Sequence, residues 1–303
     1  MKLSQKPSKT VRKQLIYGGP KRGKTYLAGK LAEKFNLHWF VLENGGVDTL
    51  REFPVEWQDR VEVYAVPDSP LTPTASETIM RVLEGGPRKI CEKHGKVNCP
   101  ICAKTSDAIY QTIDINALGP DDILVIDSGT QLTESIKAVV GRALTDDQKF
   151  EFDHWSHLGK ITAKIGSLIQ AAPCSIVFLT HEAEIELEDG KKMLVPVFGS
   201  SSTARTFAKY FHDVIYCDFK MKNYIALSTQ RANGLVYAGS RHSSYKLDDL
   251  KNEELTLVPF YTEKEVIKDG NKQTQAQVPG APTLAAKTAA RTGGILGKLG
   301  SGN

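Results

Sequence analysis

The sequence predicts an α/β protein built on a mainly parallel central sheet. Short apolar, β-branched segments alternate along the chain with segments whose apolar residues recur at helical spacing. A glycine-rich segment, YGGPKRGKTYLA at residues 17–28, lies between the first such strand and the first such helix. Strands this apolar need cover on both faces, which is typical of parallel sheets packed between helices.

The expected strands are VRKQLIYG, HWFVLEN, VEVYAV, ILVIDS, SIVFLTH, VIYCDF and YIALST, which begin at residues 11, 38, 61, 123, 175, 214 and 224. After the first strand, KTYLAGKLAEKF predicts a helix with Leu27, Leu31 and Phe35 on one stripe. A second helix is expected for HWSHLGKITAKIGSLIQAA, which precedes the fifth strand. The segment AEIELEDGKKMLVPV predicts a hairpin with Asp189-Gly190 at its turn.

The chain has 303 residues, of which 41% are apolar and 24% charged, as is typical of a globular protein. We expect a flexible N-terminus at residues 1–10 and a core over residues 11–250. After about Thr262 the chain is rich in Gly, Ala, Thr and Gln, so we expect the C-terminal extension over residues 251–303 to be mostly a disordered tail. The net charge of +4 permits a nucleic-acid partner without requiring one.

The location of the protein is predicted from what the chain lacks and from its cysteines. No apolar run approaches the roughly 20 residues of a membrane helix, and the basic start has no apolar stretch behind it, so we expect no membrane contact. Three of the five cysteines cluster within twelve residues, which suggests metal binding rather than disulfides and hence a reducing cytosol. We therefore expect a cytoplasmic protein, in the bacterial host cytosol if a phage encodes it.

The glycine-rich segment fits the pattern G-x-x-x-x-G-K-[ST] in the right context, between a strand and a helix. In this pattern Lys24 binds the β- and γ-phosphates, and the Thr25 hydroxyl is a ligand of Mg²⁺. Asp127, at the end of ILVIDS, is expected to serve the same Mg²⁺; a capping aspartate is the alternative. A turn that matches by chance is the alternative for the loop. The expected nucleotide-binding residues are Gly18, Gly19, Pro20, Lys21, Arg22, Gly23, Lys24, Thr25 and Tyr26.

The catalytic base must come from another strand, because Ser128 follows Asp127 where many ATPases have a glutamate. Glu43, at the end of HWFVLEN, is the expected base, since a carboxylate at that strand end would face the γ-phosphate. The alternative is a surface glutamate before the turn Asn44-Gly45-Gly46.

Together, the phosphate loop, Glu43, the pair Asp127-Ser128 and the polar residue His181 at the end of SIVFLTH resemble the RecA-type ATPase core. The resemblance covers about residues 11–250 and is strongest to the short Sak-type annealing and recombination ATPases of bacteriophages. It implies that His181 senses the γ-phosphate, although RecA itself usually has glutamine there. A histidine that satisfies a strand-end hydrogen bond is the alternative.

The resemblance also implies a site shared between subunits, in a ring or a filament. A neighbouring copy would supply a cation from its last hairpin, for which Arg241 fits better than Arg231; a solvated arginine is the alternative. Single-stranded DNA would bind after His181. The expected DNA-contacting residues are Lys191, Lys192, Phe198, Arg205 and Lys209. Four glutamates and Asp189 in the same stretch make its charge mixed.

The cysteine cluster has the spacing Cys91-x₂-His94-x₄-Cys99-x₂-Cys102. Four soft ligands in two close pairs suit a closed, tetrahedral and therefore structural Zn²⁺ site. We expect a small zinc-knuckle insertion over residues 88–104; three incidental cysteines are the alternative. Its surrounding lysines and Arg88 could contact DNA or a neighbouring subunit, or only solvate the loop.

The expected function is that of a Mg²⁺-dependent ATPase coupled to single-stranded DNA in phage recombination or annealing, with ATP, Mg²⁺ and structural Zn²⁺ as cofactors. A single-strand-binding protein or another replication protein is a further expected partner. Two alternatives remain: a nucleotide-dependent loader or assembly ATPase acting on a protein, and a P-loop kinase of a small molecule. The kinase would need an arginine-rich lid, and no such segment stands out.

Overall fold

The computed structural model describes residues 11–43, 45–68, 72–145, 148–188, 190–220, 223–229, 236–241, 245–248, 250 and 252–262. The flexible N-terminus expected at residues 1–10 and the tail expected after residue 262 lie outside this part of the chain. Among the described residues, no helix is both long and apolar enough to cross a membrane.

A mainly parallel sheet forms the centre of the described structure, as the sequence predicts. Its strands follow the order β11-β10-β1-β7-β6-β2-β3, and all neighbours from β10 to β3 are parallel. The parallel strands are β1 (Lys13–Tyr17), β2 (Asn36–Val41), β3 (Val61–Ala65), β6 (Asp122–Asp127), β7 (Ser175–Thr180) and β10 (Asp213–Lys220). Two further strands, β11 (Asn223–Leu227) and β12 (Gly239–Ser240), pair antiparallel with β10.

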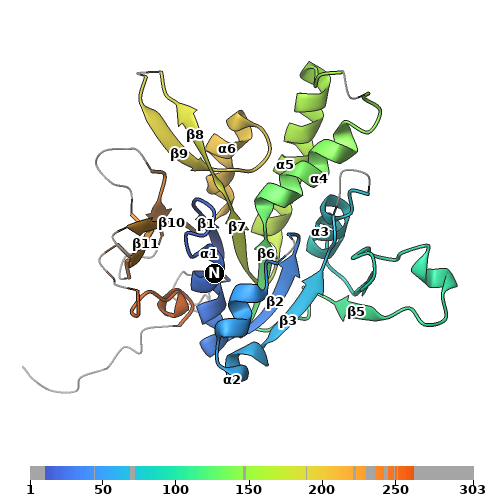
Figure 1. Ribbon diagram of the computed structural model, residues 1–303, viewed down its shortest axis with the longest axis horizontal. Coiled ribbons are helices and arrows are strands. Elements are labelled where there is room, and N and C mark those ends of the chain that lie inside the picture. The colour runs from blue at the N-terminus through green and yellow to red at the C-terminus, as the bar shows by residue number, and fades with distance from the viewer. Residues whose placement is uncertain are drawn as a thin grey trace, which may run out of the picture. The chain divides into compact units, whose positions relative to one another are not determined.

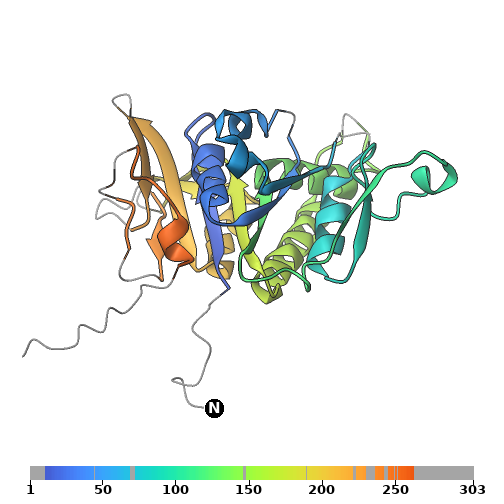
Figure 2. The ribbon, with the colours of Figure 1, turned by 90° about the horizontal axis from the view of Figure 1, so that it is seen from below.

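Helices cover the two faces of this sheet (Figures 1 and 2). One face carries α3 (Ala75–Leu83), α4 (Gly129–Val140) and α5 (Phe152–Ala171), and the other carries α1 (Lys24–Gly29), the 3₁₀ turns η2 (Lys30–Glu33) and η3 (Asp48–Glu52), and α2 (Val55–Gln58). Because side chains alternate across a strand, the buried residues of β1 divide between two cores. Leu15 and Tyr17 pack on the α3–α5 side, and Ile16 packs on the α1 side.

The first expected helix is shorter than the sequence predicts. α1 ends at Gly29 and the chain continues as the 3₁₀ turn η2, although Leu27, Leu31 and Phe35 are all buried. A Cβ on Gly29 would lie 2.6 Å from the Phe53 ring, so the close approach of η3 and its neighbour requires glycine here. Glycine also weakens a helix interior, which is consistent with the change in helix type at this residue.

The core extends beyond residue 250, so the expected domain boundary was placed too early. Leu255, Leu257 and Phe260 are buried on the α1 side of the sheet, the last in the 3₁₀ turn η6 (Val258–Phe260). Tyr261 donates a hydrogen bond to Gln14 Oε1 at 2.7 Å. The change in composition begins only after Thr262, so it does not mark the earlier boundary that we expected.

The predicted insertion is larger than residues 88–104. Its two strands, β4 (Arg88–Cys91) and β5 (Tyr110–Ile113), pair antiparallel and enclose the 3₁₀ turn η4 (Cys102–Lys104), so we define the β4–β5 insertion as residues 88–113. It packs closely on the end of β3, since a Cβ on Gly95 would lie 2.5 Å from Val66 Cα. Thr78 of α3 donates a hydrogen bond to the Gly95 carbonyl at 2.8 Å.

The predicted hairpin is present as β8 (Glu182–Glu186) and β9 (Lys192–Pro196), which pair antiparallel directly after β7. It leads into α6 (Ser201–Phe207) and the turn η5 (Ala208–Tyr210). Figure 1 shows this hairpin and the β4–β5 insertion projecting from different parts of the molecule.

Candidate active site

The phosphate loop, residues 18–23, connects β1 to α1 along a path that only glycine permits at two positions. A Cβ on Gly18 would lie 2.1 Å from the carbonyl oxygen of Cys217, so the loop touches the backbone of β10. Gly23 has a φ of +82°, and a Cβ on it would lie 2.8 Å from the Tyr224 ring. The ring and the strand therefore hold the loop in shape, which is what a phosphate cradle requires.

Lys24 is buried within its own loop. Its Nζ donates hydrogen bonds to the carbonyl oxygens of Gly18 at 2.9 Å and Gly19 at 2.8 Å. Burial lowers the pKa of this ammonium group, although the nearby carboxylates of Asp127 and Glu43 oppose the shift. An anion that enters the loop would offer Lys24 a charged partner in place of two neutral carbonyls, and such bonds are roughly twice as strong.

Among the other expected nucleotide-binding residues, one side chain is held by contacts and three are exposed. Arg22 lies 3.6 Å from Asp218 and donates to the Phe219 carbonyl at 3.1 Å, so β10 holds its guanidinium. Pro20, Lys21 and Tyr26 are exposed.

Thr25 and Asp127, the expected Mg²⁺ ligands, are in contact. The Thr25 hydroxyl donates to Asp127 Oδ2 at 3.3 Å, and the carboxylate lies at the buried end of β6. Burial, with the charge of Glu43, raises the pKa of Asp127 from 3.8 to about 7. A divalent cation between the two oxygens would offset both effects, so the residues present fit such an ion.

The Asp127 pKa predicts a pH-dependent stability for the protein without nucleotide. A raised pKa stabilises the folded state below about pH 4, and this stabilisation is lost as the pH rises through about 7. Between pH 6 and pH 8 the free energy of unfolding of Asp127→Asn should therefore gain on the order of 1 kcal/mol relative to wild type. Urea unfolding at both pH values measures this. An exposed control, Asp153→Asn, should show no such gain, and a pH-independent difference for Asp127→Asn would contradict the shift.

Glu43 lies next to this pair because β2 and β6 are neighbours and end at the same edge of the sheet. Its Oε1 accepts a hydrogen bond from the Ser128 hydroxyl. Ser128, which stands where many ATPases have a glutamate, thus orients the Glu43 carboxylate from the neighbouring strand β2.

His181 lies between Lys24 and Glu43. Its Nδ1 is 3.4 Å from Lys24 Nζ, and its Nε2 is 3.9 Å from Glu43 Oε1. Burial, followed by repulsion from Lys24, lowers the pKa of the imidazole, so the ring is neutral at pH 7. The backbone N–H of His181 donates to Thr130 Oγ1 at 2.9 Å, which fixes the strand end against α4.

The sheet order explains why four distant residues meet. β1, β7, β6 and β2 are consecutive neighbours, and all are parallel. Their carboxyl ends therefore present Lys24, His181, Asp127 and Glu43 along one edge, where ligands of open α/β sheets bind.

Arg241 lies away from this edge. It follows β12, which pairs with Asp213 and Val214 at the start of β10, and its N–H donates to the His212 carbonyl. The arginine is exposed at the opposite end of the strands from its own phosphate loop. Within one chain it does not join the site. Arg231 lies outside the described residues.

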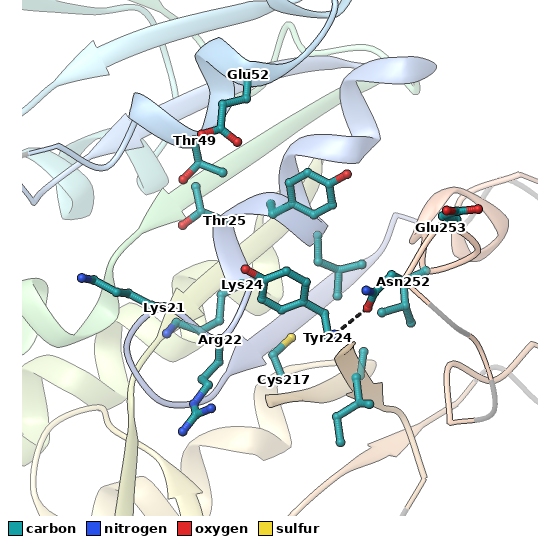
Figure 3. A pocket seen from close by; sticks show the side chains of 16 residues that line it. Lys21, Arg22, Lys24, Thr25, Thr49, Glu52, Cys217, Tyr224, Asn252 and Glu253 are labelled. Carbon is teal, nitrogen blue, oxygen red and sulfur yellow. Dashed lines mark hydrogen bonds between the residues drawn. The ribbon is translucent and has the colours of Figure 1, made fainter. Parts of the chain in front are cut away.

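A cavity of about 550 Å³ opens beside the phosphate loop (Figure 3). Its walls include Thr49 and Glu52 of η3, Tyr224 of β11, and Asn252 from the C-terminal extension. The rings of Tyr26 and Tyr224 are near parallel, at 19°, with centroids 6.4 Å apart. Sequence reasoning missed Tyr224 and Asn252, because neither stands in a motif and the second lies in the segment expected to be tail.

The four predicted metal ligands converge in the β4–β5 insertion. His94 Nδ1 lies 3.2 Å from Cys102 Sγ, 3.5 Å from Cys99 Sγ and 3.9 Å from Cys91 Sγ, and all four donor atoms lie within 4.8 Å of one another. A tetrahedral ion with ordinary Zn–S and Zn–N bonds has edges of about 3.5–3.8 Å. The donor set and its geometry therefore fit a closed zinc site, and the three thiols are buried.

The expected DNA-contacting residues are not brought together. Phe198 is 0% exposed and packs against Phe178 and Phe207, so the expectation that it meets a base was wrong: its ring belongs to the core. Lys192 is paired with Glu184 at 2.6 Å. Lys209 lies over the Tyr210 ring, and Lys191 is exposed on β9's side of the hairpin turn. The Arg205 side chain lies outside the described part of α6.

The fold and the site define a P-loop ATPase, and comparison with known proteins agrees. The family model described as AAA domain matches residues 10–246, so the chain belongs to that family. No curated protein matches the chain.

Two similar solved structures come from type III secretion systems. A prototypical ATPase of pathogenic bacteria is 15% identical, with a TM-score of 0.36, over 70% of this chain and 51% of that one. The assembled ATPase EscN from enteropathogenic E. coli is 15% identical, with a TM-score of 0.36, over 69% and 43% of the two chains. The chain thus spans about half of each.

Proposed function

We propose that this ATPase requires Mg²⁺ and couples ATP hydrolysis to the binding of single-stranded DNA, in annealing or strand exchange during phage recombination. The observation that carries the proposal is the position of His181. It contacts Lys24 and lies near Glu43, and the β8–β9 hairpin begins at the next residue. A change at the γ-phosphate would therefore reach the hairpin directly, as the RecA resemblance implies.

In the proposed mechanism, Thr25 and Asp127 would hold Mg²⁺, which would supply positive charge at the phosphates. Lys24 leaves the loop carbonyls and binds the transferred phosphoryl group. Glu43, oriented by Ser128, accepts a hydrogen bond from the attacking water. His181 is neutral and lies next to Lys24 and Glu43. It therefore responds when Lys24 binds the phosphoryl group or when Glu43 binds the attacking water.

The cavity beside the loop is the proposed place of the nucleoside, with the base against Tyr224. Stacking on an aromatic ring is worth about 1–3 kcal/mol per base, so Tyr224→Ala should weaken ATP binding about tenfold. The affinity for inorganic tripolyphosphate should fall much less than that for ATP, because it loses only the support that the ring gives to Gly23, and Tyr224→Phe should retain ATP affinity. Competition against a fluorescent ATP analogue measures all three. Equal losses for ATP and tripolyphosphate would place the base elsewhere.

We propose that the Cys/His cluster holds structural Zn²⁺. Cys102→Ser should lower the zinc content from about one per chain to near zero and expose the β4–β5 insertion to proteases, because structural metal binding is coupled to folding. Cys174→Ser, which removes a buried thiol of the core, is the control and should keep its zinc. Full zinc content in Cys102→Ser would contradict the site. Elemental analysis and limited proteolysis are the measurements.

Self-association into a ring or filament is part of the proposal, since the described site lacks an arginine facing Lys24 within the chain. Arg241 of a neighbouring copy would supply that charge. A single-strand-binding protein is a proposed partner in the same process, and the cytosol is the proposed location.

A second candidate function is that of an assembly ATPase or loader acting on a basic protein. The acidity of the hairpin favours it: β8 carries Glu182, Glu184 and Glu186. Nucleotide-dependent DNA binding separates the two functions. We expect a fluorescent oligo-dT to bind more tightly with a non-hydrolysable ATP analogue than with ADP, and this difference to vanish in His181→Ala. Absence of any DNA binding would overturn the proposed function and leave the loader.

A further inference from the structure

A second cavity, of about 390 Å³, lies where the β4–β5 insertion meets the body of the protein. Three cationic side chains line it: Lys93 and Lys96 from the insertion, and Arg142 from the segment after α4. Thr72 and Thr74 add hydroxyl groups, and no acidic residue is among the described residues that line it. We name it the cationic cavity.

The three cations of this cavity outweigh the negative charge near them within the described residues. Its wall includes His94 and Cys99, and a Zn²⁺ ion held by three thiolates and one imidazole would contribute a net charge of −1. Lys96 forms an ion pair with Glu77 at 3.4 Å, in which both side chains are 39–48% exposed and thus largely hydrated. No ion pair involves Lys93 or Arg142 among the described side chains, and both are exposed. Like charges that converge on one concave surface raise the local potential and attract an anion.

The backbone that carries these lysines is held in place. Lys93 lies between the predicted zinc ligands Cys91 and His94, and Gly95 packs on the end of β3. Thr78 also binds the Gly95 carbonyl. A cavity on such a fixed frame loses less conformational entropy on binding than flexible surface lysines would.

The hairpin after His181 is less suited to a polyanion. Its glutamates oppose a phosphate chain, Lys192 is already paired with Glu184, and Phe198 is buried. Next to the cationic cavity, by contrast, Ile101 is 64% exposed and lines the cavity wall, where an apolar contact with a base or sugar is available. The charges and the apolar side chain together fit a single nucleic-acid strand.

We propose that the cationic cavity binds the phosphate backbone of single-stranded DNA, with Lys93, Lys96 and Arg142 as phosphate-contacting residues. This inference rests on the proposed function and adds to it a DNA contact on the β4–β5 insertion.

Fluorescence anisotropy of labelled oligo-dT with the full-length, zinc-loaded protein tests it, over a range of salt concentrations. The double variant Lys93→Ala/Arg142→Ala should bind at least about tenfold more weakly at 100 mM salt, and the slope of log affinity against log salt should fall by about 1.4, or 0.7 per lost phosphate contact. Lys89→Ala/Lys104→Ala removes two exposed charges of the same insertion outside the cavity and should change affinity less than threefold. Zinc content and melting temperature establish that each variant is folded.

The outcomes separate the inference from the proposed function. Wild-type binding that the cavity variant leaves intact, with an unchanged salt slope, overturns the inference while DNA binding stands. Equal losses in the cavity and control variants also overturn it, since charge anywhere on the insertion would then suffice. No binding by the wild-type protein overturns the proposed function itself.

Discussion

Lys24→Ala is expected to abolish ATP hydrolysis, with a fall in kcat/KM of at least about 10³-fold. The ammonium group is the buried cation of the phosphate loop, and it lies within hydrogen-bonding reach of two loop carbonyls and 3.4 Å from His181. Removing it takes away both phosphate binding and charge stabilisation during transfer, and one such preorganised donor is worth about 10²–10³ by itself. Steady-state phosphate release measures the effect.

Lys34→Ala is the matched control for this variant. Lys34 is a surface lysine, 59% exposed, that forms an ion pair with Glu33 at the end of the 3₁₀ turn η2, which follows α1. Its activity should remain within about twofold of wild type. Residual activity above a few per cent in Lys24→Ala would mean that phosphates bind elsewhere than in the loop.

Glu43→Gln is expected to lower kcat by about 10²–10³-fold while ATP binding is retained. Glutamine keeps an oxygen that accepts the Ser128 hydrogen bond, so the local structure is preserved, but the amide cannot accept a proton from water. Because the ground-state contacts to nucleotide are unchanged, KM should stay within about threefold. Single-turnover kinetics separate the chemical step from binding.

Glu33→Gln is the matched control for Glu43→Gln, because it removes a surface carboxylate of the same charge. Its kcat should equal that of wild type. A Glu43→Gln protein with wild-type kcat would show that another group activates the water. Loss of nucleotide affinity in step with kcat would instead make Glu43 a structural residue, acting through Ser128.

Much of the site could be predicted because parallel strands end at one edge. Once VRKQLIYG, HWFVLEN, ILVIDS and SIVFLTH were assigned as strands, Lys24, Glu43, Asp127 and His181 had to fall near one another, and the sheet order makes them neighbours. The Cys/His spacing was equally informative, since short loops bring all four donors together.

What could not be predicted depends on tertiary packing. Tyr224 and Asn252 reach the cavity beside the phosphate loop only because β11 and the C-terminal segment pack next to α1, which no local pattern indicates. Phe198 looked available for a base because aromatic residues in loops often are, yet its ring packs against Phe178 and Phe207 and is buried in the core. Arg142 joins Lys93 although 49 positions separate them in the sequence.

The most direct measurement is the steady-state ATPase rate of the full-length protein with and without single-stranded DNA, in wild type and Glu43→Gln. We expect DNA to raise the wild-type rate at least about fivefold, and Glu43→Gln to stay near background in both conditions. A wild-type rate indifferent to DNA would contradict the coupling between the nucleotide site and a DNA site. A Glu43→Gln rate that DNA still stimulates would contradict the assignment of the base.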